Sequence, residues 1–195
     1  MIVTVKTEGL DRLANMLAAA GPKARDAIRR ALNHSGMKAR TQMIRALTAQ
    51  TGLKRAVIVR ALKVSRAVHG GDMASPGSGG LTFAIRSAGG NIRLKFFGAR
   101  ETRAGVSAAP RGQRRTYPGA FIKGGRFPRR VPLKLGGNVF RRIGPGRRPI
   151  AQIRSGVFIP EEMVEGASRD AFLGTVESSL PARLSHELLL SLIHI

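Results

Sequence analysis

The chain has 195 residues, enough for one domain with a hydrophobic core but too few for two large ones. Apolar residues make up 43% of it, which excludes a wholly disordered chain, and the lack of cysteine excludes disulfides and thiolate zinc sites. The formal net charge is +23, and self-repulsion of that size favours a polyanionic or acidic partner that neutralises it.

The first quarter of the sequence predicts mainly helix. Residues 2–6 alternate like a short strand, and apolar positions between Leu10 and Ala18 recur at helical spacing. Pro22 then precedes a long helix whose apolar stripe is rich in small side chains. The stripe consists of Ala24, Ile28, Ala31, Leu32, Ser35, Ala39, Met43 and Ala46. Because small residues allow close approach, we expect another element to pack tightly on this face.

The pattern changes after Thr51-Gly52, where we expect the long helix to end. Leu53, Val57 and Ala61 predict one more short helix, followed by an extended segment over residues 64–68. Residues 69–80 are rich in Gly, Ser and Pro and predict a loop. Residues 81–85 and 92–96 alternate with period two around Gly89-Gly90-Asn91, which predicts that they pair as a β-hairpin.

The second half predicts short strands and then a helix. Extended pieces are expected at residues 105–108, 120–123 and 138–143. Glu161 and Glu162 suit a helix start, and apolar residues continue at helical spacing from Val164 to Val176, with Pro181 expected to kink or end that helix. The expected fold is α+β: a short N-terminal strand, a long Ala- and Arg-rich helix packed on an antiparallel sheet, a basic loop-rich arm and a C-terminal helix.

We expect a single domain with three parts, over residues 1–99, 100–156 and 157–189. No apolar stretch approaches the roughly 20 residues that cross a bilayer, so no membrane partner is expected. The N-terminal residues do not resemble a signal peptide, and the lack of cysteine fits assembly in a reducing cytoplasm.

Positive charge is concentrated between Arg100 and Arg154, where 15 basic residues stand against one acid, Glu101. These residues can neutralise phosphates and release counterions, which predicts salt-sensitive DNA binding. The alternatives are a solvated surface or contacts with acidic protein neighbours. No helix-turn-helix, zinc-finger or stacking-aromatic motif accompanies the charge, so sequence-specific binding is not expected. The candidate residues are Arg111, Arg114, Arg115, Lys123, Arg126, Arg129, Arg130, Arg141, Arg142, Arg147 and Arg148, with Lys134 in the same run.

Catalytic chemistry has no candidate in the sequence. The glycines of residues 98–105 and 144–147 predict tight turns, because neither segment carries the Gly-Lys-Ser/Thr ending of a nucleotide-binding loop. Asp72 and Glu101 are isolated from other acids, so no carboxylate cluster for a metal is expected, and no cofactor either. Glu101 lies between Arg100 and Arg103, and we expect it to be paired and to fix its loop rather than to contact a partner.

Residues 97–107, Phe97-Gly98-Ala99-Arg100-Glu101-Thr102-Arg103-Ala104-Gly105-Val106-Ser107, and the following Pro118-Gly119-Ala120-Phe121-Ile122 resemble the central signature of the phage minor tail protein Z (tail completion) family. The likeness extends over roughly residues 5–189. It implies a structural virion protein without enzymatic activity, added late at the head-proximal end of a long tail after synthesis in the host cytoplasm. It also implies contacts with tail terminator or neck proteins and with terminal DNA.

Two other functions compete with this one. Composition alone favours a free nucleic-acid-binding protein of ribosomal or nucleoid type, whereas the signature favours the tail protein. A phage nuclease is disfavoured because it would need an acidic cluster. The C-terminal part carries a net charge of −4 from Ser155 onward, which suits contact with the basic zone of a neighbouring copy in a ring, and equally suits an amphipathic helix packed on its own sheet.

The last six residues, 190–195, are the translation of CTG TCT CTT ATA CAC ATC, which resembles the transposase end sequence used as an adapter in sequencing libraries. We expect this segment to be foreign to the natural protein, whose chain would then continue past Leu189. The alternative is an apolar tail that docks on the domain or on a neighbouring subunit.

Overall fold

The structure is a computed structural model that describes residues 23–68 and 81–193. Helices and antiparallel strands occur together, which confirms the expected α+β class. The chain forms two compact units: unit 1 comprises Met1–Ile44, Leu62–Ser87 and Val164–Ile195, and unit 2 comprises Arg45–Ala61 and Ala88–Met163. The expected division into parts at residues 99 and 156 stays a prediction. The expected strand at 2–6, helix at 10–18 and loop at 69–80 lie outside the described residues.

The long helix α2 spans Ala24–Thr51. Five of its eight predicted stripe residues are buried and the other three are half-buried, so the helical period is confirmed. Close approach to α2 occurs at Gly36, which the predicted stripe did not include, because a Cβ added there would lie 2.4 Å from the ring of Phe83. The helix ends where expected, because Gly52 takes a left-handed φ of +71° and the Thr51 hydroxyl accepts the N–H of Leu53.

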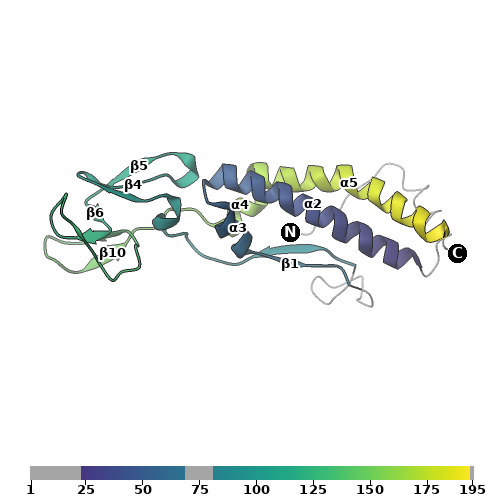
Figure 1. Cartoon of the computed structure of the whole chain (residues 1–195), viewed down its shortest axis with the longest axis horizontal. Helices are drawn as coiled ribbons and strands as arrows, with labels where there is room; N and C mark the ends of the chain where they lie inside the picture. Colours follow the sequence, from purple (N-terminus) through teal and green to yellow (C-terminus); the bar gives the residue numbers. More distant parts are fainter. Residues whose placement is uncertain (1–22, 69–80, 194–195) are drawn as a thin grey trace. The chain divides into compact units, whose positions relative to one another are not determined.

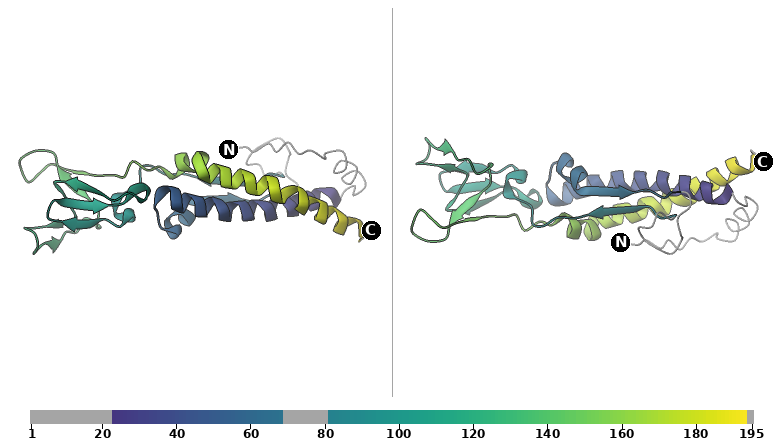
Figure 2. Two further views of the ribbon diagram at one scale, coloured as in Figure 1. Left: turned by 90° about the horizontal axis from the view of Figure 1, so that it is seen from above. Right: turned by 90° about the horizontal axis from the view of Figure 1, so that it is seen from below.

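Helix α4 spans Ile159–Val164 and α5 spans Gly166–Ile193. The sequence predicts one helix here, but Gly166, with a φ of +60°, separates two. Of the two outcomes expected at Pro181, a kink or an end of the helix, the end is excluded, because α5 continues through this residue. Val176 before Pro181 and Leu188 after it are both buried. This packing holds the helix in place although proline has no N–H to donate to the preceding turn. Within unit 1, α2 and α5 run side by side in opposite directions (Figure 1, Figure 2).

The predicted hairpin between residues 81–85 and 92–96 is wrong. Strand β2 (Ala84–Ser87) pairs instead with β1 (Leu62–Ser65), antiparallel, with Leu62 opposite Ser87. The Asn33 amide ties the end of β1 to α2, since it donates to the carbonyl of Ala67 and accepts its N–H.

Residues Leu94–Phe97 form the 3₁₀ helix η2 in place of the second predicted strand. Leu94 and Phe97 are buried while Phe96 is 38% exposed, a spacing of three that one helical turn satisfies and a strand does not. The preceding residue Ile92 is bound instead to the segment before α4, through its N–H to Val157 and its carbonyl to Ser155.

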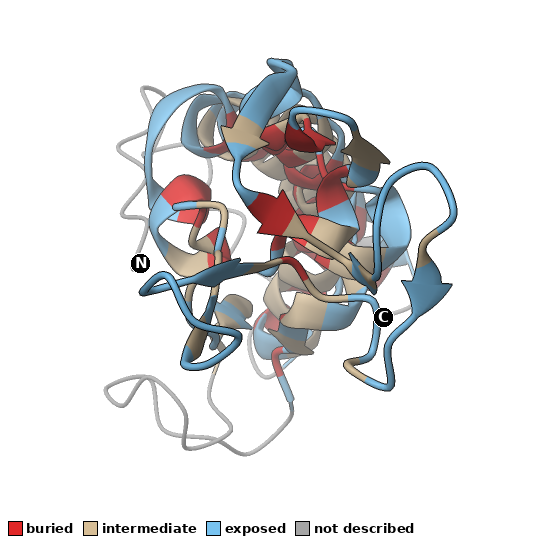
Figure 3. Cartoon of the chain, turned by 90° about the vertical axis from the view of Figure 1, so that its left-hand side faces the viewer, coloured by how far each residue is buried: buried red, intermediate tan, exposed pale blue. Residues whose placement is uncertain are grey.

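Unit 2 contains short antiparallel strands joined by long connections. One sheet has the order β3-β4-β5, another has the order β10-β9-β6, and β7 pairs with β8. All four residues of β4 are buried, and Figure 3 shows exposed, pale blue loops around the buried, red segments. The bounds are β3 Arg100–Thr102, β4 Gly105–Ala108, β5 Arg115–Pro118, β6 Ala120–Phe121, β7 Lys123–Gly124, β8 Val131–Pro132, β9 Phe140–Arg142 and β10 Ile150–Gln152.

These strands confirm the three predicted extended pieces, although residues 120–123 are divided between β6 and β7. Two short helical elements complete unit 2: α3 at Arg55–Ala61, which confirms the predicted short helix, and the 3₁₀ helix η3 at Pro110–Gly112. Gly105 is needed where β4 meets β5, because a Cβ there would lie 2.2 Å from the carbonyl oxygen of Tyr117.

Candidate nucleic-acid interface

The positive charge of the protein is concentrated in unit 2. Its residues include 21 Lys and Arg and three Glu, a formal net charge of +18, whereas the described part of unit 1 has 11 basic and five acidic residues. Two of the three acids of unit 2, Glu101 and Glu162, are held in internal ion pairs. The surface of unit 2 is therefore strongly cationic, which is the electrostatic footprint expected of a polyanion-binding protein.

A groove of about 950 Å³ lies in unit 2 among β6, β7, β9 and the connections that follow β8 and β9. Its lining contains no acidic side chain. Phe121, whose ring lies 6.4 Å from that of Phe140, contributes an apolar surface. The basic residues of this cationic groove are Arg103, Lys123, Arg130, Lys134, Arg141, Arg142, Arg147 and Arg148.

The groove gathers six of the eleven residues that the sequence predicts for DNA binding, together with Lys134 from the same run. The six are Lys123, Arg130, Arg141, Arg142, Arg147 and Arg148. Arg126 and Arg129 lie in the β7–β8 turn, exposed, between the groove residues Gly125 and Arg130. Sequence reasoning missed Arg103, which it assigned to a structural loop. The convergence of residues 103 and 148 on one groove has no signal in the linear sequence.

Arg114 and Arg115 do not line the groove. Both are exposed, and their guanidinium groups donate to the Ser107 hydroxyl at 3.3 Å and to the Gln113 side chain at 3.1 Å. Neutral partners leave their charge available, so they remain candidates for contacts outside the groove.

Arg111 makes contacts inside unit 2, and its predicted contact with DNA stays a prediction. It adopts a left-handed backbone, with φ 55° and ψ 32°, and its guanidinium binds one carboxylate oxygen of Glu162 at 2.7 and 3.1 Å. The Gln50 amide donates to the other oxygen at 2.6 Å. Glu162 is 8% exposed, so this network joins η3, α4 and the end of α2 inside unit 2.

Glu101 is half-buried and holds two segments that line the groove. One carboxylate oxygen accepts the N–H groups of Ile122 at 3.0 Å and Lys123 at 3.1 Å, and the Arg130 guanidinium at 2.7 Å. Burial raises the pKa of Glu101, but these three donors outweigh it and lower the pKa below 4.5. The expected pairing of Glu101 is confirmed, although its partner is Arg130 and not Arg100 or Arg103.

The residues that resemble the tail-protein signature are divided between the interior of unit 2, its turns and the lining of the groove, which includes Arg103, Gly105 and Phe121. Phe97, Val106 and Ala120 are buried, and Gly98 and Gly119 have positive φ values of 64° and 69°. These residues support the sheets from which the groove residues project. No protein-family model, curated protein or solved structure matches the chain.

The two glycine-rich segments lie beside these sheets. Residues 98–105 comprise the left-handed end of η2, strand β3 and the turn into β4, whereas Gly144, Pro145 and Arg147 line the groove. In residues 23–68 and 81–193 no three His, Asp or Glu side chains form a group that could hold a metal ion. No helix in the same ranges is long and apolar enough to cross a membrane.

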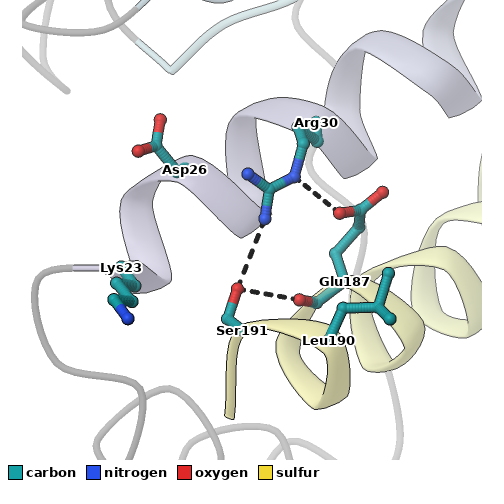
Figure 4. Close-up of a pocket in the computed structure, with 6 residues that line it drawn as sticks. All are labelled: Lys23, Asp26, Arg30, Glu187, Leu190 and Ser191. Atoms are coloured by element: carbon teal, nitrogen blue, oxygen red, sulfur yellow. Dashed lines mark hydrogen bonds and ion pairs between the residues drawn. The ribbon is translucent and has the colours of Figure 1, made fainter. Parts of the chain in front are cut away.

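Unit 1 contains a separate charged cluster between its two helices. Arg30 of α2 points toward Glu187 and Ser191 of α5 beside a hollow of about 560 Å³ (Figure 4). The Glu187 carboxylate is 4% exposed and binds Arg30 at 2.6 Å and Arg183 at 2.5 Å. Burial raises the pKa of Glu187, but the two guanidinium groups outweigh it and lower the pKa below 4.5. The cluster joins α2 to α5, and sequence reasoning missed it.

Proposed function

We propose that this chain is a structural, non-enzymatic virion protein that completes the head-proximal end of a phage tail and binds DNA without sequence preference through the cationic groove. The observation that carries the DNA-binding part is a groove with eight basic side chains and no acidic one. Phosphates would release counterions on entering it, which favours association with any DNA sequence. Support for the tail assignment comes from the resemblance of residues 97–107 and 118–122 to the tail completion signature.

The chemistry of the groove favours binding over bond cleavage. Phosphodiester hydrolysis generally needs carboxylates that hold divalent cations, and the groove lining contains none. The carboxylate of Glu101, which binds the groove residues Lys123 and Arg130, accepts three hydrogen bonds from the protein itself. The groove residues would therefore hold and orient the DNA backbone.

DNA binding is tested with a charge-reversed groove. The triple variant R142E/R147E/R148E changes three exposed groove residues that make no ion pair in the structure. K63E/R66E/R86E is a matched control, since it reverses three exposed cations of unit 1. We expect fluorescence anisotropy with unrelated DNA duplexes to give equal, salt-sensitive affinities, a loss of at least about tenfold for the groove triple, and a smaller loss for the control. Equal losses would mean that net charge and not the groove is responsible.

The assembly role is tested by deleting the gene from its phage. Filled heads and tails of normal length, with few infectious particles, are the expected result. Abnormal tail length or empty heads would assign the chain to length control or packaging. Gene neighbourhood separates the tail role from the alternative of a free ribosomal or nucleoid-type protein, because tail terminator and major tail genes should flank the former.

A further inference from the structure

The β7–β8 turn presents an aromatic ring beside the cationic groove. Phe127 is 42% exposed, although each large apolar side chain left in water forgoes the free energy of burial. Its neighbours Arg126 and Arg129 are also exposed, and the turn lies between Gly125 and Arg130, which both line the groove. A ligand held in the groove would therefore meet this ring and its two arginines next to the phosphate contacts.

The turn is anchored at its base. Glu101 accepts hydrogen bonds from the N–H of Lys123 on β7 and from the guanidinium of Arg130 just before β8, so one half-buried carboxylate holds both ends of the hairpin. Within the turn, the N–H of Arg130 donates to the carbonyl of Pro128 at 3.0 Å. A ring on an anchored turn loses little conformational freedom when it stacks on a ligand.

The excess of positive charge at this site favours a polyanionic ligand. The turn Arg126-Phe127-Pro128-Arg129 has two cations and no acid, and the adjoining groove adds eight more cations. Nucleic acid is the polyanion that also offers flat aromatic faces to a ring. A duplex exposes those faces only after its base pairs unstack, whereas a single strand exposes them without that cost.

We propose that Phe127 stacks on an unpaired nucleobase while the groove holds the adjacent phosphates. This inference rests on the proposed DNA binding and adds single-stranded or frayed DNA as the preferred ligand. It does not require recognition of a particular base, because every base has an aromatic face.

The test uses tryptophan fluorescence, since the chain contains no Trp. F127W places the only indole at the turn, and F96W is the matched control, because Phe96 in η2 has a similar exposure of 38% but does not line the groove. The probes are single-stranded oligothymidine, a blunt duplex, and linear polyphosphate, which carries charge without bases. We expect oligothymidine to quench F127W strongly, the duplex to quench it weakly, and polyphosphate and the F96W control to show no quenching.

Affinity gives a second readout. F127A should weaken oligothymidine binding about tenfold and leave polyphosphate binding and its salt dependence unchanged. If oligothymidine bound F127W without changing its fluorescence, the inference would be overturned. The exposed ring would then be assigned to a contact with another protein. Equal quenching by duplex and single strand would overturn the preference for unpaired bases. Failure of the wild-type chain to bind either polyanion would instead refute the proposed function itself.

Discussion

The carboxylate of Glu101 accepts a 2.7 Å hydrogen bond from the guanidinium of Arg130, 29 residues later in the chain. The same carboxylate oxygen caps the N–H groups of Ile122 and Lys123, so one acid fixes the strands on both sides of the β7–β8 turn. The side chains are 10% and 19% exposed, and solvent therefore screens their attraction little. The only acid among the 16 charged residues between Arg100 and Arg154 organises part of the basic surface around it.

Glu101→Gln should lower the stability of unit 2. The amide oxygen can still accept one or more N–H groups, but the half-buried Arg130 cation loses its counter-charge. We expect a loss of about 2–3 kcal/mol in the free energy of unfolding, measured by urea denaturation. The control is E161Q at an exposed position of α4, with an expected change within about 0.5 kcal/mol. Equal stability of the two variants would show that the Glu101 pair contributes nothing.

Stability should fall in acid because of Glu101 and Glu187. Burial raises each pKa, but the hydrogen bonds and guanidinium groups outweigh it, and both pKa values lie below 4.5 in the folded chain. A carboxyl with a lowered folded pKa stabilises the fold above its unfolded pKa, and this contribution is lost as the pH falls through the folded pKa. We therefore expect the Tm to decrease below about pH 4.5.

The measurement is a series of thermal melts from neutral to acidic pH. The double variant E101Q/E187Q should melt lower at neutral pH and lose less on acidification. The exposed pair E161Q/E177Q is the control and should keep the acid sensitivity of the wild type. A double variant with the wild-type acid profile would contradict the assignment to these two groups.

Patterns among neighbouring residues were enough to predict several individual helices and strands. The apolar stripe from Ala24 to Met43 predicted α2, and the glycine-bounded residues 105–108 predicted β4. The hairpin failed because Ile92-Arg93-Leu94-Lys95-Phe96 carries two periods at once: the alternation suggested a strand, but burial of Leu94 and Phe97 selects a helical turn. Strand β2 then pairs with β1, a more distant segment that its own alternation does not identify.

The sequence predicted that basic residues of this run could bind DNA, but it did not predict which of them line one groove. Charge density alone singled out the run from Arg111 to Arg148. It could not separate Arg111 and Arg130, which bind Glu162 and Glu101, from Arg142 and Arg147, which face the groove without an acidic partner. Such pairings join residues 29 and 51 positions apart, and short sequence patterns carry no information on contacts at that separation.

Two glycines in long helices should respond in opposite ways to alanine. At Gly36 in α2 a Cβ would lie 2.4 Å from the ring of Phe83, so G36A forces the ring or the strand to move and should cost about 1–3 kcal/mol. At Gly174 in α5 a Cβ would meet nothing within 4 Å, so G174A should stabilise by about 0.5–1 kcal/mol through helix propensity. Urea denaturation of both variants tests the packing of unit 1. A neutral G36A would contradict the close contact with Phe83.

The described side chains at the end of α5, Leu190, Ser191 and Ile193, should contribute little to the stability of unit 1. Ser191 is buried and its hydroxyl joins the carbonyl of Glu187 to Arg30, but the Glu187 carboxylate keeps its ion pairs with Arg30 and Arg183 without it. Leu190 and Ile193 are 39% and 75% exposed and contribute little burial. Ending the chain at Leu189 should therefore cost about 1–2 kcal/mol, the value of the two hydrogen bonds of the Ser191 side chain, whereas R30M should cost more because Glu187 loses a partner. Calorimetric Tm values compare the two variants. A truncation as damaging as R30M would mean that the last turn of α5 is an integral part of unit 1.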